Sequence, residues 1–124
     1  MRSYAEIYQR SIKQPELFWA EAAEGLDWEQ RWEQVLDRTA QPTPRWFAGG
    51  RLNTCFNALD RHVDAGHGER LALIYDSPVT DQVQRYSYQA LRDQVAALAG
   101  AIAAQGVGRG DRVIIYMPMI PEAA

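Results

Sequence analysis

The feature that most constrains the fold is an almost unbroken apolar run near the end of the sequence, DRVIIY, from Asp111 to Tyr116. Strands that are buried on both faces of a parallel sheet have this composition, because neither face meets water. The run follows a long segment in which apolar residues recur at helical spacing, at Leu91, Val95, Leu98 and Ile102. A helix between strands is the usual crossover that returns a chain for parallel pairing. The pattern predicts an α/β fold with a strand at residues 112–116.

The segments before that helix support the same fold class. Residues 70–77 and 83–88 read as two strands joined by a turn at Pro78 to Asp81. Ser87 is a suitable N-cap for the helix, and Gly106 is a suitable end. Pro121 then reads as the first residue of another helix. Since a finished domain rarely stops one turn into a helix, we expect this sequence to be the truncated front part of a larger domain.

The first 50 residues have a different character. Ser3 and Glu6 predict a capping box for a short helix, and a second helix is expected from Pro15 to about Gly25. Residues 26–45 have no sustained period and are interrupted by prolines near their end, so we expect an irregular wrap. The fold prediction is therefore a helical and irregular N-terminal extension followed by the first strands and helix of an α/β domain.

A short extended segment and a third helix are expected between these two parts. Trp46 and Phe47 are followed by Ala48-Gly49-Gly50, in which the glycines permit the positive φ angles of a tight turn. The third helix is predicted over about residues 54–65, with Asn53 as its N-cap and Gly66 as its C-cap. Its apolar positions follow helical spacing, at Leu52, Phe56, Leu59 and Val63.

Composition excludes several classes of protein. The formal net charge is -3, from 13 basic and 16 acidic residues, so no basic field is available to hold nucleic acid. A single cysteine, Cys55, excludes an internal disulfide framework, and the N-terminus lacks the apolar core of a signal peptide. No apolar run approaches the roughly 20 residues of a membrane helix. We expect a cytoplasmic protein without a nucleic-acid or membrane partner.

The glycine-rich stretch GVGRGD at residues 106–111 resembles a phosphate-binding loop. Phosphate loops run from a strand into a helix, so that the amides of the helix N-terminus face the anion. This stretch runs from a helix toward a strand, and we interpret it as a helix-capping turn. The tripeptide Arg109-Gly110-Asp111 within it is too short a pattern to indicate adhesion.

The other chemistry-bearing residues favour structural roles. His62 and His67 have no further ligands at metal-site spacing, and Cys55 has no activating partner and is expected to be a buried, inert thiol. The Asp60-Arg61 pair reads as a solvated face or local ion pair. The four tryptophans are interpreted as packing residues rather than as an adenine platform. These residues alone predict no catalytic, cofactor-binding or metal-binding site.

Four stretches of the sequence resemble one enzyme family in order and over essentially the whole chain. They are YQRSIKQPELFWAEAAEGLDW (8–28), RWFAGGRLNTCFNALDRHV (45–63), LALIYDS (71–77) and RYSYQALRDQVAALAGAIAAQGVGRGDRVIIYMPMIPEAA (85–124). Together they are similar to the N-terminal part of the short-chain acyl-CoA synthetases, and within them to the propionyl-CoA synthetase group. YSYQAL resembles the first core motif of adenylate-forming enzymes. The resemblance implies an N-terminal extension at 1–52 and the incomplete beginning of an AMP-binding domain at 53–124.

The resemblance implies an enzyme that joins a small carboxylic acid, propionate, to coenzyme A with ATP and Mg²⁺. The carboxylate attacks the α-phosphate to give an acyl-adenylate and pyrophosphate, and the coenzyme A thiol then displaces AMP. The family's Ser/Thr/Gly-rich phosphate loop, ribose-binding Asp and mobile lysine have no counterpart up to Ala124. We therefore assign no catalytic, cofactor or metal residue here, and expect the fragment to be inactive and to self-associate. An acetyl-CoA synthetase fragment and a non-catalytic binding or regulatory module remain the alternatives.

Overall fold

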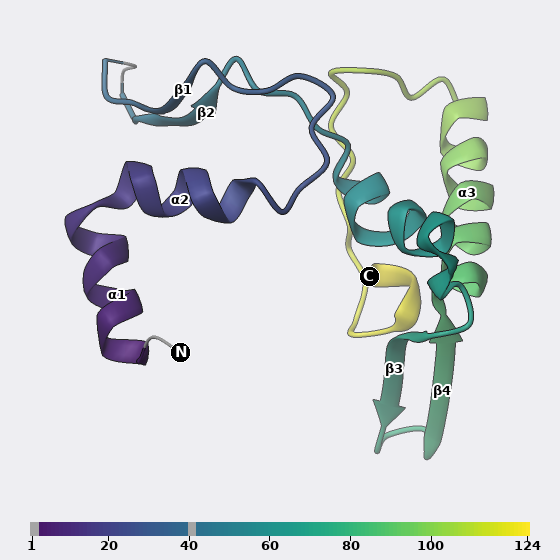
Figure 1. Ribbon diagram of the computed structural model, residues 1–124. Coiled ribbons are helices and arrows are strands. Elements are labelled where there is room, and N and C mark those ends of the chain that lie inside the picture. The colour runs from purple at the N-terminus through teal and green to yellow at the C-terminus, as the bar shows by residue number, and fades with distance from the viewer. Residues whose placement is uncertain (1–2, 40–41) are drawn as a thin grey trace. The chain divides into compact units, whose positions relative to one another are not determined.

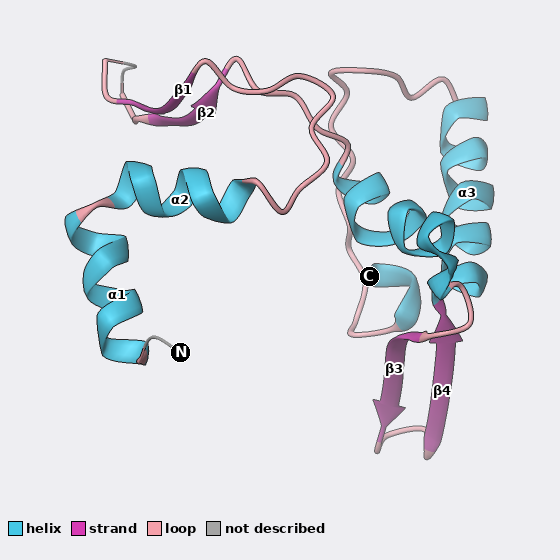
Figure 2. Ribbon diagram, viewed as in Figure 1, coloured by secondary structure: helices cyan, strands magenta, loops and turns pink. Residues whose placement is uncertain are grey.

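The computed structural model describes residues 3–39 and 42–124. By its internal contacts the chain divides into two compact units, Met1–Asn57 and Ala58–Ala124. The elements of both units are labelled in Figure 1 and distinguished by type in Figure 2. None of the helices in the described ranges combines the length and the apolar content needed to cross a bilayer.

The first unit begins with two consecutive helices, α1 (Tyr4–Lys13) and α2 (Pro15–Ala23), which meet at a bend in Figure 1. The predicted capping box is confirmed, because Glu6 N donates to Ser3 Oγ at 3.3 Å while Ser3 N donates to the Glu6 carboxylate at 2.7 Å. Pro15 suits the first position of α2, because no N–H is needed there and the fixed φ of proline is helical. The side chain of Arg10 also pairs with Glu21, which joins the two helices.

A two-stranded antiparallel sheet comes next along the chain, made of β1 (Gln34–Asp37) and β2 (Arg45–Ala48). The extended segment before the glycines was predicted, but the expectation that residues 26–45 are wholly irregular is wrong, because β1 lies within them. Four residues are too few to show a period, and β1 is defined by its pairing with β2, in which Leu36 lies opposite Trp46. The turn after β2 has the predicted positive φ of 80° at Gly49.

An aromatic cluster of Trp28, Trp32 and Phe47 packs together in this unit. The ring of Trp28 lies 4.9 Å from that of Trp32 and 5.5 Å from that of Phe47, and Trp32 and Phe47 are 5.2 Å apart. The indole N–H of Trp28 donates to the carbonyl of Ala23 at 2.9 Å, so the polar edge of the ring is satisfied. The predicted packing role of these tryptophans is confirmed.

The third helix extends over residues 54–67, but much of it is π-helical. Two π stretches, η1 (Phe56–Asp60) and η2 (Val63–His67), are separated by two α-helical residues. The predicted N-cap is confirmed, since Phe56 N donates to Asn53 Oδ1 at 3.0 Å. Gly66 has a φ of 80°, which interrupts the right-handed helix where a cap was predicted. No residue pattern in this stretch indicates the π-helical form.

The thiol of Cys55 is exposed, and the expectation that it is buried is wrong. Apolar residues recur at helical spacing from Phe56, and Cys55 lies one residue before that stripe, about 100° away around a helix. Free cysteines are usually buried, but the position of Cys55 on the helix leaves its side chain exposed.

The second unit contains the predicted hairpin and long helix. Strands β3 (Leu71–Ser77) and β4 (Gln82–Ser87) pair antiparallel, with an irregularity between Leu71 and Leu73. Helix α3 (Tyr88–Ala104) is capped as expected, because Ala90 N donates to Ser87 Oγ at 3.2 Å. It packs against both strands and against η2. Gly106, at φ 88°, ends it and donates to the carbonyl of Ala103 at 2.9 Å.

Residues 112–116 do not form the predicted strand. They are extended but have no ladder partner among the described residues, and the short 3-10 turn η3 (Pro121–Ala123) comes after them. Ile114 is 87% exposed and Tyr116 is 98% exposed. A strand exists only when neighbouring backbone groups bond to it, and the hairpin β3–β4 pairs with itself. The apolar composition is that of a buried strand, but the segment lies in solvent.

Candidate functional site

A hollow of about 310 Å³ in the first unit lies beside the start of the third helix. Two aromatic rings, two carboxylates and an amide line it, from Asp27, Trp28, Glu29, Asn53 and Phe56. This volume is at the lower end of the range for small-molecule pockets. The rings offer an apolar surface and the carboxylates and amide offer polar groups, so the hollow is a candidate binding site for a small molecule.

A buried amide fixes one wall of this hollow. Asn57 is only 9% exposed, and its Oδ1 accepts a hydrogen bond from Asp27 N at 2.9 Å. Its Nδ2 donates to the carbonyl of Asp27 at 2.9 Å and to that of Asn53 at 3.0 Å. This arrangement, which we call the Asn57 clamp, holds the backbone of Asp27 to the helix start. Sequence reasoning missed it, because its partners are thirty residues apart.

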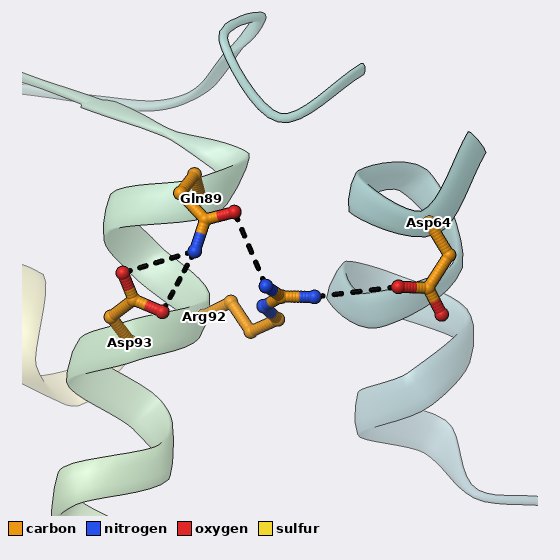
Figure 3. A network of polar contacts seen from close by, with 4 residues as sticks. All are labelled: Asp64, Gln89, Arg92 and Asp93. Atoms are coloured by element: carbon orange, nitrogen blue, oxygen red, sulfur yellow. Dashed lines mark hydrogen bonds and ion pairs between the residues drawn. The ribbon is translucent and has the colours of Figure 1, made fainter. Parts of the chain in front are cut away.

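A second polar group lies on α3 in the other unit (Figure 3). The amide of Gln89 donates to both carboxylate oxygens of Asp93, at 2.8 and 3.0 Å, and accepts from Arg92 at 3.2 Å. Arg92 also bonds to Asp64 in η2 at 3.4 Å. Spacings of three and four residues on one helix could have revealed the first contacts in the sequence. These charges are solvated, and the arrangement joins α3 to η2 rather than forming a catalytic site.

The remaining sequence candidates take structural positions. His62 packs on Tyr88, with ring centroids 4.8 Å apart. The GVGRGD stretch is a turn, as predicted, in which Gly108 N donates to the Asp111 carboxylate at 2.7 Å and Gly110 has a φ of 98°. Among the described residues, no three His, Cys, Asp or Glu side chains gather closely enough to hold a metal ion.

The ion pair between α1 and α2 changes the electrostatics of one side chain. The hydrogen bond from Arg10 to Glu21 raises the pKa of the Arg10 guanidinium above its ordinary value. A guanidinium is already cationic at neutral pH, so this shift is a consequence of the ion pair and prepares no acid or base. The described residues therefore do not fit a nucleotide or magnesium site, because they provide neither a phosphate loop after a strand nor a cluster of oxygen ligands.

Comparison with known families identifies the chain. A family model described as the acetyl-coenzyme A synthetase N-terminus matches residues 4–58, and one described as AMP-binding enzyme matches residues 59–124. The second match covers more than half of the chain, which therefore belongs to the AMP-binding enzyme family, in its acetyl-CoA synthetase-like part.

Individual relatives agree with this family. The chain is 57% identical over 122 residues to an uncharacterised protein of Pseudomonas aeruginosa, covering 98% of this chain and 19% of that protein. It is 49% identical over 121 residues to the propionate–CoA ligase of Salmonella typhimurium, with 98% and 19% covered. The mitochondrial acyl-CoA synthetase short-chain family member 3 of Rattus norvegicus is 47% identical over 120 residues, with 97% and 18% covered.

The likeness extends to structure. The acetoacetyl-CoA synthetase of Streptomyces lividans superposes with a TM-score of 0.79 at 32% identity, over 99% of this chain and 19% of that chain. This confirms the predicted fold class, the N-terminal part of an acyl-CoA synthetase. The chain spans about a fifth of the length of the relatives it matches.

Proposed function

We propose that the protein to which this sequence belongs is an AMP-forming acid–CoA ligase that activates propionate with ATP and transfers the acyl group to coenzyme A. The observation that carries the proposal is the consecutive match of the two family models, together with 49% identity to a propionate–CoA ligase. Residues 1–52 are then the N-terminal extension, and residues 53–124 begin the AMP-binding domain.

Acetate is the second candidate substrate, because the model that matches residues 4–58 is that of the acetyl-coenzyme A synthetase N-terminus. A protein of the relatives' full length that carries this sequence is expected to release pyrophosphate with ATP, Mg²⁺ and propionate. Acetate should have a kcat/KM lower by about 10- to 200-fold, the discrimination that one methylene group allows. A kcat/KM for acetate equal to or above that for propionate would move the assignment to an acetyl-CoA synthetase.

The 124-residue chain by itself is expected to neither bind nor hydrolyse ATP. Its glycine-rich turn leaves a helix rather than entering one, and its described residues lack the ligands that a nucleotide–magnesium complex needs. Calorimetric titration with ATP and Mg²⁺ measures this directly, with the full-length Salmonella propionate–CoA ligase as the positive control. A dissociation constant in the micromolar range would contradict the prediction and indicate an unrecognised site.

The partners proposed for the whole protein are a small carboxylic acid, ATP and coenzyme A, with no nucleic acid and no membrane. A cytoplasmic location stays a prediction, because the names of the mammalian relatives place those proteins in mitochondria.

A non-catalytic module is the remaining alternative. It predicts that the gene contains no downstream segment encoding a Ser/Thr/Gly-rich phosphate loop, which sequencing of the locus tests. For the isolated chain we propose self-association through residues 112–116, either by edge-to-edge strand pairing or by exchange of this segment between two copies.

A further inference from the structure

Strand β3 has one edge without a strand partner among the described residues. The sheet of the second unit is two-stranded, so β4 occupies one edge of β3 and leaves the other open. A hollow of about 260 Å³ borders four consecutive residues of β3, 73–76. Successive side chains of a strand point to opposite faces of the sheet, so a hollow that borders consecutive residues lies along an edge and not over one face. The hollow therefore follows the open edge of β3.

The far wall of this hollow is the C-terminal turn, which contributes Met119, Ile120, Pro121 and Ala124. The backbone bonds of that turn are local, since Ala123 N donates to the Ile120 carbonyl at 3.0 Å and Ala124 N to the Pro121 carbonyl at 3.1 Å. In the described part of the chain no backbone hydrogen bond joins the turn to β3. A strand that is added to β3 can therefore replace the turn without breaking a ladder.

Residues 112–116 match the open edge of β3 in length and in side-chain pattern. They are extended and exposed, and no described residue pairs with their backbone. Arg112 is the only charged residue of this segment, and Asp76 is the only charged residue of β3. An antiparallel alignment places these two opposite each other, whereas a parallel alignment of the same length places Tyr116 opposite Asp76. The antiparallel alignment also opposes apolar residues up to the irregularity at the start of β3, as Val113–Tyr75, Ile114–Ile74 and Ile115–Leu73.

The two faces of β3 select the register of this alignment. Leu73 and Tyr75 are half-buried on one face, whereas Ile74 and Asp76 are exposed on the other. With Arg112 opposite Asp76, the charged pair lies on the exposed face and alternate apolar residues of the segment extend the covered face. A shift by one residue would place Arg112 on the covered face, at the cost of burying its charge.

We propose that residues 112–116 of one copy add to the open edge of β3 in a second copy, antiparallel, with Arg112 opposite Asp76. This inference rests on the self-association proposed above and names the surface that accepts the segment. Each copy carries one such segment and one such edge, so two copies can satisfy each other reciprocally. The outer edge of the added segment stays open, and the same segment of a further copy can pair with it there.

Charge reversal tests the alignment in the 124-residue chain. Asp76→Arg places two cations opposite each other at both contacts of a reciprocal dimer, and Arg112→Asp places two carboxylates there. Each variant should raise the dissociation constant of the dimer by about ten-fold. The double variant exchanges the signs and restores both pairs, so its constant should return to within about three-fold of that of the unmodified chain. Light scattering after size exclusion, over a dilution series, measures all of these.

Glu33→Arg is the matched control, because Glu33 is exposed and lies in the first unit. It makes the same change of charge as Asp76→Arg and should leave the dissociation constant within about two-fold of that of the unmodified chain. A general effect of net charge would have the opposite sign, since either substitution reduces the net charge of -3 and thereby weakens repulsion between copies.

Hydrogen exchange provides an independent measurement of the accepting edge. The amides of β3 and those of residues 112–116 should both exchange more slowly at high than at low protein concentration. Slower exchange in 112–116 alone would show that the segment pairs only with itself. That result, or association that is indifferent to Asp76→Arg, would overturn β3 as the acceptor and leave self-association intact. A monomeric unmodified chain would instead refute the self-association on which the inference rests.

Discussion

At about micromolar concentration, the 124-residue chain is expected to scatter light as dimers and larger assemblies rather than as a 14.1 kDa monomer. The cause is the extended segment 112–117, in which Val113, Ile114, Ile115, Tyr116 and Met117 are all exposed. Its backbone groups have no ladder partner among the described residues. An unpaired, apolar, extended segment is a template for pairing with the same segment of another copy.

A matched pair of substitutions distinguishes strand pairing from non-specific association through any exposed apolar side chain. Ile114→Lys places a charge in the middle of the segment, as natural edge strands do to prevent pairing, and should weaken association by about ten-fold or more. Val79→Lys is the control, since Val79 is 92% exposed but lies in the hairpin turn between β3 and β4. Light scattering after size exclusion measures both. A sharp monomer peak for the unmodified chain would disprove the prediction, and equal effects of the two lysines would assign association to another surface.

Replacing Trp28 with alanine is expected to lower the free energy of unfolding of the first unit by about 3 kcal/mol, at the lower end for large aromatic truncations because the ring is half-buried. The indole contacts Trp32 and Phe47 and donates to the carbonyl of Ala23. The loss therefore combines a cavity, aromatic contacts and one hydrogen bond. The unit has little else to compensate, since Ala23 and Leu36 are the only buried apolar side chains among its described residues.

Trp46→Ala is the matched control for this prediction. Trp46 is 45% exposed and lies at the edge of the cluster, so its removal should cost about 1 kcal/mol. Urea unfolding followed by far-UV circular dichroism compares the two without relying on tryptophan fluorescence. Gly50→Ala provides an independent test and should also lower the free energy of unfolding. A Cβ at Gly50 would lie 2.7 Å from the Trp28 ring and 3.0 Å from the Phe47 carbonyl, so it would displace the ring. If Trp28→Ala were no more harmful than Trp46→Ala, the cluster would not be the core of this unit.

Features that depend on a few neighbouring residues could be predicted from the sequence. The capping box at Ser3, the cap at Ser87, the hairpin between β3 and β4 and the end of α3 near Gly106 all appear where expected. Each is decided by interactions within a few residues, between a side chain and the nearest backbone groups or by a φ angle that glycine permits. The family resemblance was also visible at this level, because the motifs that carry it are continuous stretches of the chain.

Tertiary structure alone decided the features that depend on distant partners. β1 became a strand because β2 lies beside it, and residues 112–116 did not become one because no described segment pairs with them. The Asn57 clamp joins two segments thirty residues apart, and neither the exposure of Cys55 nor the π-helical turns follow from a local residue pattern. Hydrogen-bond partners and burial are properties of pairs of segments, whereas periodicity describes one segment at a time. The sequence alone therefore determined which residues prefer helix, turn or strand, and the assembled chain determined which of these preferences were satisfied.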